Sequence, residues 1–168
     1  MATRTESPRL PALVMSEPVL AGNILVAIDG SEGAERALAF AAAVARVAGG
    51  RLTLLTVVPP PRLPAFAMAP GYDPRAIEKQ WAEELHAAAD KAPLDIPVTL
   101  LLAHGNPARE IVRRAEEGCH DLVVLGCEGH GLFHGALGGV SQRVLRHCSV
   151  PVLVVRSPGV TAEPQSSS

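Results

Sequence analysis

A glycine-rich stretch, GCEGHGLFHGALGGVS (126–141), stands between an apolar run and a helix-like run. Six glycines lie between positions 126 and 139. Residues without a Cβ let main-chain N–H groups approach a ligand, and the N-terminus of a following helix favours an anion. The stretch therefore predicts a phosphate-binding turn, although glycine runs alone are also typical of plain surface turns.

A second polar group follows the first apolar run of the chain. Asp29 comes directly after ILVAI (24–28) and is suited to bind a ribose hydroxyl or an adenine amino group. In an open parallel sheet with strand order 3-2-1-4-5, the ends of strands one and four are neighbours at the point where the order reverses. We therefore expect Asp29 and the glycine stretch to form two walls of one crevice.

The elements that would position these groups alternate regularly along the chain. Continuous apolar runs predict strands at 24–28, 52–58, 97–103, 121–126 and 151–155. Helical spacing and caps predict helices from Ser31 to Gly49, over 77–92, over 106–118 and over 140–147. Five strands with helices between them predict a flavodoxin-like, doubly wound α/β fold with helices on both faces of a parallel sheet.

Two proline-containing segments are interpreted differently. Asn106 and Pro107 are predicted as the cap and first residue of a helix. The six prolines from Pro59 to Pro74 are predicted to forbid regular structure until a helix face begins at Ile77 and Trp81. That face predicts core packing and not a cofactor site. His104, at the end of the third strand, is predicted to be structural or on the surface.

Composition sets the wider limits. The 168 residues suffice for one domain, and 48% are hydrophobic but only 3% aromatic, which favours an aliphatic, alanine-rich core. A net charge of -2 without long charged blocks argues against nucleic-acid or anionic-membrane binding. No apolar run is long enough to span a membrane. The three cysteines do not resemble a disulfide framework, which favours a cytoplasmic location. We expect a domain over 22–157, with disordered tails at 1–21 and 158–168.

Several segments resemble the universal stress protein family in order and spacing. They are ILVAIDGSEGAERAL, LTLLTVVPP, HGNPAREIV, DLVVLGCEGHG and VSQRVLRHCSVPVLVVR, and together they cover roughly residues 23 to 156. The resemblance implies a flavodoxin-like sandwich that is usually dimeric. The nucleotide-binding branch of the family has the pattern G-x2-G-x9-G-[ST] and binds ATP at the crevice described above.

The resemblance also implies candidate nucleotide contacts. By position, Gly126 and Gly129 match the first two glycines, Asp29 matches the acidic group after the first strand, and Val57 matches a main-chain contact to adenine. The remaining candidates are Ala27, Gly138, Gly139, Val140 and Ser141.

This sequence departs from the pattern at its last position. Counting nine residues from Gly129 gives Gly139 followed by Val140, whereas alignment on VSQRVLRH places Gly139 where Ser or Thr is expected. Either way the hydroxyl is missing. A hydrogen bond to a charged phosphate is worth about 1.5–3 kcal/mol, so we expect ATP or ADP, with or without Mg²⁺, to bind tenfold to roughly a hundredfold more weakly. Ser141 lies within one turn and offers another hydroxyl.

Other functions are weighed against nucleotide binding. Cys127, His130 and His134 have the spacing C-x2-H-x3-H and could form a metal site, although a glycine-rich loop fixes ligands poorly. The chain has no Walker lysine, no Gly-x-Ser-x-Gly elbow and no S-G-G-x-D-S loop, so we expect no efficient enzyme and at most slow ATP hydrolysis.

A third possibility is a dimeric interaction module with an empty crevice. The last strand, VLVV, would be an apolar edge that needs a partner, so we expect a homodimer through Val152 and Val154. The preferred interpretation is a dimeric, ATP- or ADP-binding stress-response sensor or regulator.

Overall fold

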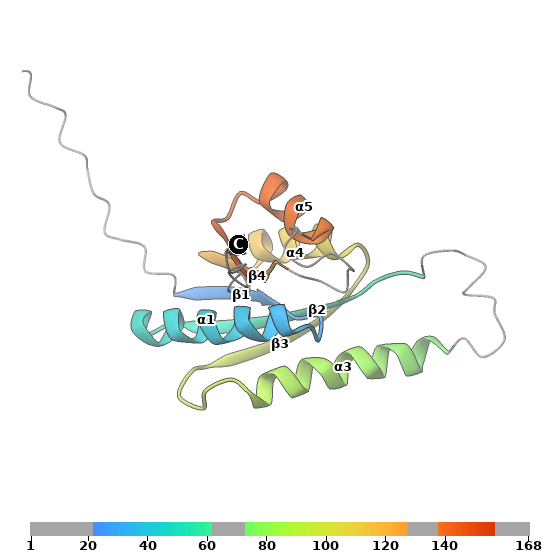
Figure 1. Ribbon diagram of the computed structural model, residues 1–168, viewed down its shortest axis with the longest axis horizontal. Coiled ribbons are helices and arrows are strands. Elements are labelled where there is room, and N and C mark those ends of the chain that lie inside the picture. Colours follow the sequence, from blue (N-terminus) through green and yellow to red (C-terminus); the bar gives the residue numbers. More distant parts are fainter. Residues whose placement is uncertain (1–21, 62–72, 128–137, 157–168) are drawn as a thin grey trace, which may run out of the picture.

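The computed structural model describes residues 22–61, 73–127 and 138–156 (Figure 1). The strands are β1 (Asn23–Ala27), β2 (Arg51–Val58), β3 (Val98–His104), β4 (Leu122–Gly126) and β5 (Val152–Val155). The helices are α1 (Glu32–Ala48), α3 (Pro74–Asp90), α4 (Pro107–Glu117) and α5 (Gly139–His147). Each predicted element is present, while both predicted tails lie outside the described residues.

The strands form one parallel sheet in the order β3-β2-β1-β4-β5. Ile24 of β1 pairs with Leu52 of β2 on one side and with Leu122 of β4 on the other. The chain therefore moves outward from β1 in one direction through β2 and β3, and in the other through β4 and β5. This confirms the predicted fold class and places the reversal of strand order between β1 and β4.

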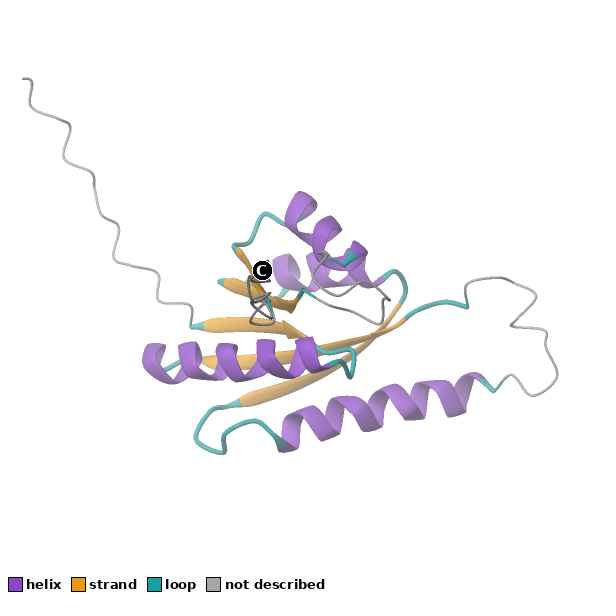
Figure 2. Cartoon of the chain, viewed as in Figure 1, coloured by secondary structure: helices purple, strands orange, loops and turns teal. Residues whose placement is uncertain are grey.

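Helices cover both faces of the sheet (Figure 2). α1 and α3 pack on the face that carries Ile24 and Val26, and α4 and α5 pack on the face that carries Leu25. These three consecutive residues are 0% exposed, as expected for a central strand enclosed on both sides. Burying such a side chain stabilises the fold by about 1.5–3 kcal/mol.

The two edge strands are less buried than the central strands β1 and β4. All four residues of β5 are only half-buried, and in β3 Thr99 is exposed. An edge strand lacks a neighbour on one side, so its side chains are covered by fewer atoms. Both edges of the sheet are therefore candidate surfaces for pairing.

The helix ends explain most of the element boundaries. The Ser31 hydroxyl accepts a hydrogen bond from Ala34 N, and α1 stops at Gly49, which has a φ of 62°. The prediction that no regular structure precedes Ile77 is wrong at Pro74. Asp73 caps α3 and Pro74 occupies its first turn, so this proline starts the helix because its missing N–H has no partner to lose there.

A carboxylate holds the start of β1 against the start of β4. Asp121 Oδ2 accepts hydrogen bonds from Gly22 N at 3.0 Å and Asn23 N at 2.9 Å. Since the two strands are distant in sequence, this contact fixes their relative position before the ladder begins.

In the part of the chain that the structure describes, no helix is long and apolar enough to cross a membrane. The cysteines at 119, 127 and 148 are free thiols.

Candidate functional site at the carboxyl edge of the sheet

The crevice was expected at the edge of the sheet where β1 and β4 end side by side. Val26 of β1 pairs with Val124 of β4, so the residues that follow each strand leave the sheet at the same edge. Those residues are Ile28 to Ser31 after β1, and Gly126 and Cys127 after β4. α1 begins from the first connection, and α5 begins after the second (Figure 1).

Asp29 organises the turn between β1 and α1. Its Oδ1 accepts hydrogen bonds from Ser31 N at 3.1 Å and from Ser31 Oγ at 2.6 Å, while Ser31 Oγ accepts from Ala34 N at 3.2 Å. Gly30 between them has a φ of 75°, which a residue with a Cβ rarely adopts. The half-buried Asp29 thus holds the α1 cap in place.

The connection between β4 and α5 is fixed at both of its ends. Cys127 N donates to Val155 O at 2.9 Å, and Cys127 O accepts from Gly138 N at 2.9 Å. The residues between them, including the candidate contact Gly129, lie outside the described ranges. The start of α5 is therefore tied directly to the end of β4.

The N-terminus of α5 carries the strongest indication of an anion site. Gly138 is its N-cap and makes no side-chain cap hydrogen bond, and Gly139 is exposed, with nothing within 4 Å of where a Cβ would lie. The helical bonds start with Gln142 N donating to Gly138 O, so the N–H groups of Gly139, Val140 and Ser141 belong to the first turn, which has no intrahelical acceptors. Helix dipole and N–H groups together favour a bound anion.

Ser141 points inward. The residue is 6% exposed, and its hydroxyl donates to Gly126 O at 2.9 Å. A hydroxyl has one hydrogen to donate, so in this arrangement the side chain anchors α5 to β4 and leaves its main-chain N–H for a ligand. The structure therefore brings the two candidate residues Ser141 and Gly126 together through a hydrogen bond that joins α5 to β4.

Gly126 is required by packing at this point. A Cβ there would lie 2.5 Å from Gly33 C and 2.9 Å from Ala34 N, both main-chain atoms of the first turn of α1. The absence of a side chain lets the end of β4 approach the start of α1. The first glycine of the motif thus sets the distance between the two walls of the crevice.

The end of β2 lies at the same edge of the sheet, on the side of β1 that faces away from β4. Ile28 N donates to Leu55 O at 2.8 Å, and the buried Thr56 hydroxyl donates to Ile28 O at 3.1 Å. In a strand, the main-chain N–H and C=O groups of alternate residues face the same neighbouring strand. The main-chain groups of Val57, two residues after Leu55, therefore also face the β1 side. Ala27, the last residue of β1, is half-buried beside them and pairs with Leu55.

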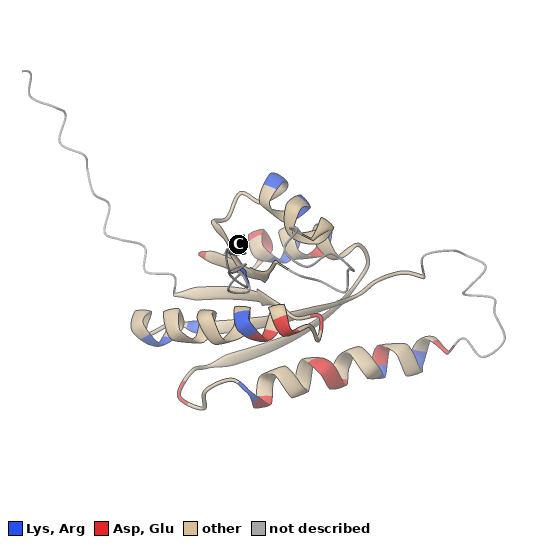
Figure 3. Cartoon of the chain, in the orientation of Figure 1, with Lys and Arg blue, Asp and Glu red and all other residues tan. Residues whose placement is uncertain are grey.

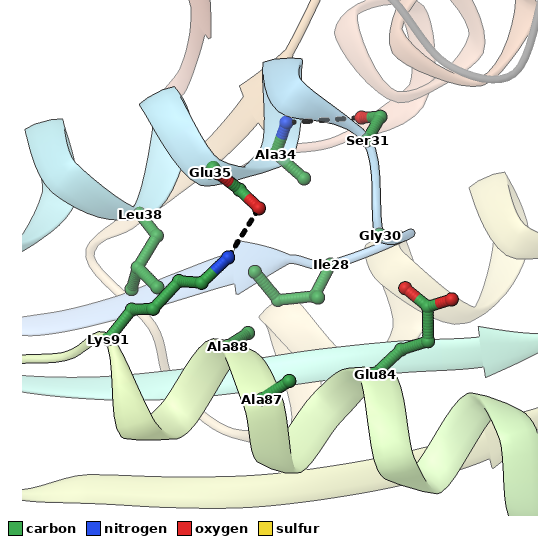
Figure 4. Close-up of a pocket in the computed structure, with 10 residues that line it drawn as sticks. All are labelled: Ile28, Gly30, Ser31, Ala34, Glu35, Leu38, Glu84, Ala87, Ala88 and Lys91. Carbon is green, nitrogen blue, oxygen red and sulfur yellow. Dashed lines mark hydrogen bonds and ion pairs between the residues drawn. The ribbon is translucent and has the colours of Figure 1, made fainter.

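A group that the sequence did not single out lies on the other side of the Gly30 turn. Glu84 of α3 points toward Gly30, and a Cβ on Gly30 would stand 1.8 Å from Glu84 Oε2 (Figure 4). They line a cleft of about 60 Å³ between α1 and α3, where Lys91 Nζ lies 2.5 Å from Glu35 Oε1. Ligand pockets for drug-sized molecules measure about 300–1,000 Å³, so this cleft is too small for a nucleotide.

Glu84 could not be recognised as a neighbour of the crevice from its sequence. It lies on a helix with acidic and basic residues on both sides, and only the tertiary packing of α3 brings it to Gly30.

The proposed metal ligands are only partly described. Cys127 is 1% exposed at the end of β4, whereas His130 and His134 lie outside the described residues. Over 22–61, 73–127 and 138–156, no group of three His, Cys, Asp or Glu residues could hold a metal ion. The C-x2-H-x3-H site stays a hypothesis. His104 is exposed at the end of β3, with Nε2 3.5 Å from Glu78 Oε2.

Comparisons with known proteins agree with this architecture. Residues 21–156 match the Universal stress protein family. A universal stress protein of Thermus aquaticus is 36% identical over 138 residues, covering 79% of this chain and 97% of the relative. A solved structure of a family member from Burkholderia pseudomallei is 29% identical with a TM-score of 0.64, covering 83% of this chain and 98% of the other.

A further solved structure is a universal stress protein in complex with cAMP. It is 26% identical with a TM-score of 0.52, and the alignment covers 82% of this chain and 98% of that chain.

Proposed function

The chain belongs to the universal stress protein family, and from that premise we propose that it binds ATP or ADP at the β1–β4 crevice and acts as a dimeric stress-response regulator. The observation that carries the proposal is the N-terminus of α5. It has a glycine cap without a side-chain hydrogen bond, and it starts beside the end of β4 and the Asp29 turn.

In this proposal the phosphates bind main-chain N–H groups of Gly139, Val140 and Ser141. Asp29 accepts a hydrogen bond from the ribose or the adenine amino group, and main-chain groups of Val57 contact the base. Gly126 and Ser141 Oγ hold the walls together, which the close approach of β4 to α1 and the hydrogen bond to Gly126 O support. Because no side-chain hydroxyl joins the N–H groups, binding is weaker than the G-x2-G-x9-G-[ST] pattern implies.

Two further facts support this assignment. One structural neighbour is a universal stress protein in complex with cAMP, which is a purine nucleotide. The edge where α5 begins is also the position at which open α/β sheets bind ligands. Mg²⁺ accompanying a nucleotide would be held largely by phosphate oxygens and water, as is usual for this ion in nucleotide sites.

The missing hydroxyl gives the sharpest test. Calorimetric titration of ATP should show roughly tenfold tighter binding to Gly139→Ser than to the parent, because the new hydroxyl can donate to phosphate. Gly139→Ala is the matched control, since the position has room for a Cβ in either variant. Equal ATP affinities of the serine and alanine variants would contradict the assignment of the phosphate site to the α5 N-terminus.

Asp29 is tested separately from its structural role. Asp29→Asn keeps an oxygen that can accept from Ser31 N, so it preserves the α1 cap while removing the charge. We expect ATP binding to weaken by about tenfold in this variant if the carboxylate accepts from the ribose or adenine. Unchanged binding, with unchanged helical circular dichroism, would exclude Asp29 as a ligand contact.

We propose that the dimer forms through β5, with Val152 and Val154 at its centre. All four β5 side chains are apolar and half-buried, whereas the other edge strand, β3, carries exposed Thr99 and ends at exposed His104. An apolar edge strand is stabilised by pairing. Sedimentation equilibrium should detect a dimer at micromolar protein, and Val154→Lys should dissociate it; a parent that sediments only as a monomer would contradict this.

The alternative function is an interaction module whose crevice holds no ligand. Mass spectrometry of small molecules extracted from freshly purified protein, with metal analysis in parallel, separates the possibilities. Nucleotide in the extract supports the crevice, stoichiometric zinc supports the Cys127, His130 and His134 loop, and an extract with neither favours the interaction module.

A further inference from the structure

We propose that an apolar stripe on α1, formed by Phe40, Val44 and Val47, is the second layer of the dimer interface and packs against a second copy of the chain. The inference rests on the β5 dimer proposed above. It assigns to this helix a role that neither the crevice nor the sheet edge requires.

The α1 stripe is an apolar surface without a charged residue in its central part. Phe40 is 45% exposed and Val47 is 84% exposed, while Val44 is partly buried against the core. Between Arg36 and Arg46 the helix carries no charge, as Figure 3 shows. A helix that packs on one face only usually carries polar residues on its other side, so this stripe indicates a further contact.

The stripe faces the β5 side of the molecule. The opposite flank of α1, with Leu38 and Ala42, borders a groove together with Lys91 and Pro93, which follow α3. On the first turn of α1, Gly33 lies against Gly126 at the end of β4. Helical periodicity puts positions 33, 40, 44 and 47 on this same flank. α1 accordingly contacts β4 and β5.

The apolar surface continues from the stripe onto the edge strand. Leu153 and Val155 of β5 are half-buried and pack against the same core cluster as Val44. Because this flank of α1 faces β5, the stripe and the Leu153 and Val155 side chains lie on the same face of the sheet.

β5 alone is too small to hold two copies together. A stable interface takes about 800 Å² and 20–30 residues from each partner, and β5 has only 4 residues. Surface beside the strand must therefore contribute. The α1 stripe is the apolar surface that adjoins β5 on its Leu153 and Val155 side.

Symmetry places the two stripes opposite each other. A two-fold axis perpendicular to the sheet pairs β5 with its copy in antiparallel fashion and keeps both α1 helices on the same face. With α1 over β1 and β4 and strands about 4.8 Å apart, the two helix axes lie roughly 19 Å apart. Direct helix packing needs about 8–10 Å, so the two α1 helices do not touch each other. The stripe of one copy instead faces the space above Leu153 and Val155 of the second copy's edge strand, into which a large side chain such as Phe40 extends.

The test compares matched charge insertions. Val47→Glu and Phe40→Glu place a carboxylate in the stripe, and Leu94→Glu places one at an exposed apolar residue on the connection between α3 and β3. We expect the dimer dissociation constant from sedimentation equilibrium to rise at least about tenfold in the stripe variants and to stay unchanged in Leu94→Glu. Thermal unfolding at high protein concentration checks that each variant folds.

The outcomes separate this inference from the β5 dimer. If Val154→Lys dissociates the dimer but both stripe variants dimerise as tightly as Leu94→Glu, the strand pairs without the helix and the stripe has another occupant, such as a segment of the same chain. If the parent is monomeric at all concentrations, the β5 dimer itself is wrong and this inference falls with it. Nucleotide affinity is measured in the same variants and is expected to stay unchanged.

Discussion

Two glycines among the candidate site residues, Gly126 and Gly139, have different physical roles. Gly126 has main-chain atoms of Gly33 and Ala34 within 3 Å of where its Cβ would lie, whereas Gly139 has nothing within 4 Å. One glycine is therefore demanded by packing, and the other is open to substitution. The difference could not be predicted from the sequence, because it depends on how closely β4 approaches α1.

This difference predicts opposite effects on stability. Gly126→Ala should lower the free energy of unfolding by about 1–3 kcal/mol, because rigid main-chain atoms must move to admit the methyl group. Gly139→Ala should leave it unchanged or raise it by up to about 1 kcal/mol, since alanine restricts the unfolded chain. Urea denaturation of both variants measures this. Equal stabilities would mean that β4 and α1 are less closely packed than the structure has them.

Cys119 is a residue in an unfavourable conformation. Its φ of 49° lies in the left-handed region, where a side chain costs roughly 1–2 kcal/mol. We expect Cys119→Gly to stabilise the protein by about 0.5–1 kcal/mol after the larger entropy of the unfolded glycine is subtracted. Cys119→Val, which is less compatible with positive φ, should destabilise it. Urea denaturation under reducing conditions compares them; a glycine variant less stable than the valine variant would contradict the assignment.

At the scale of elements, helix starts that depend on cap residues and first-turn prolines could be predicted from the sequence. Asn106 and Pro107 start α4 as expected, because cap and first-turn chemistry is local. The same rule applied to Asp73 and Pro74 would have placed the start of α3 correctly; the density of prolines before it obscured the signal. Contacts made by packing, such as Glu84 beside Gly30, have no comparable signature.

The positions of two candidate site residues could be predicted in a similar way. The strand order placed Asp29 and Gly126 at one edge, because right-handed crossovers leave few alternatives. The direction of the Ser141 side chain was not predictable, since a serine in the first turn of a helix can point to solvent or to a neighbouring strand. Here it donates to Gly126 O.

Helix α4 offers a test of pH dependence. Hydrogen bonds from the Arg113 guanidinium hold the pKa of Glu110 below its ordinary value, against a smaller opposing effect of desolvation. Such a carboxylate stabilises the fold above its unfolded pKa and loses that contribution as the pH falls through its lower folded pKa. Arg113→Leu should therefore raise the Glu110 pKa, as followed by NMR titration.

The accompanying change in stability should be small because the exposed Arg113 leaves the pair screened by solvent, and it should vanish at low pH. Arg109→Leu, at an exposed residue of the same helix, is the control and should leave the Glu110 titration in place. A Glu110 pKa that does not move in Arg113→Leu would assign its shift to another source.

For the whole molecule, the proposed dimer would make stability depend on protein concentration. If only folded chains associate, the apparent Tm should rise when the protein concentration is raised by about tenfold, and ATP should raise it further by mass action. Val154→Lys should abolish the dependence on protein concentration while keeping the response to ATP. Scanning calorimetry at two protein concentrations distinguishes these effects, and a parent Tm that is independent of concentration would argue against a dimer.

The hydrogen bond between Cys127 O and Gly138 N has a consequence for how the protein can diversify. It fixes the two ends of the intervening segment, and Cys127 N and Ser141 Oγ tie those ends to β5 and β4. The described residues on either side thus set the position of α5 against β4 and β5 by bonds of their own. An engineer can therefore exchange the sequence between Cys127 and Gly138 while these anchoring hydrogen bonds are kept.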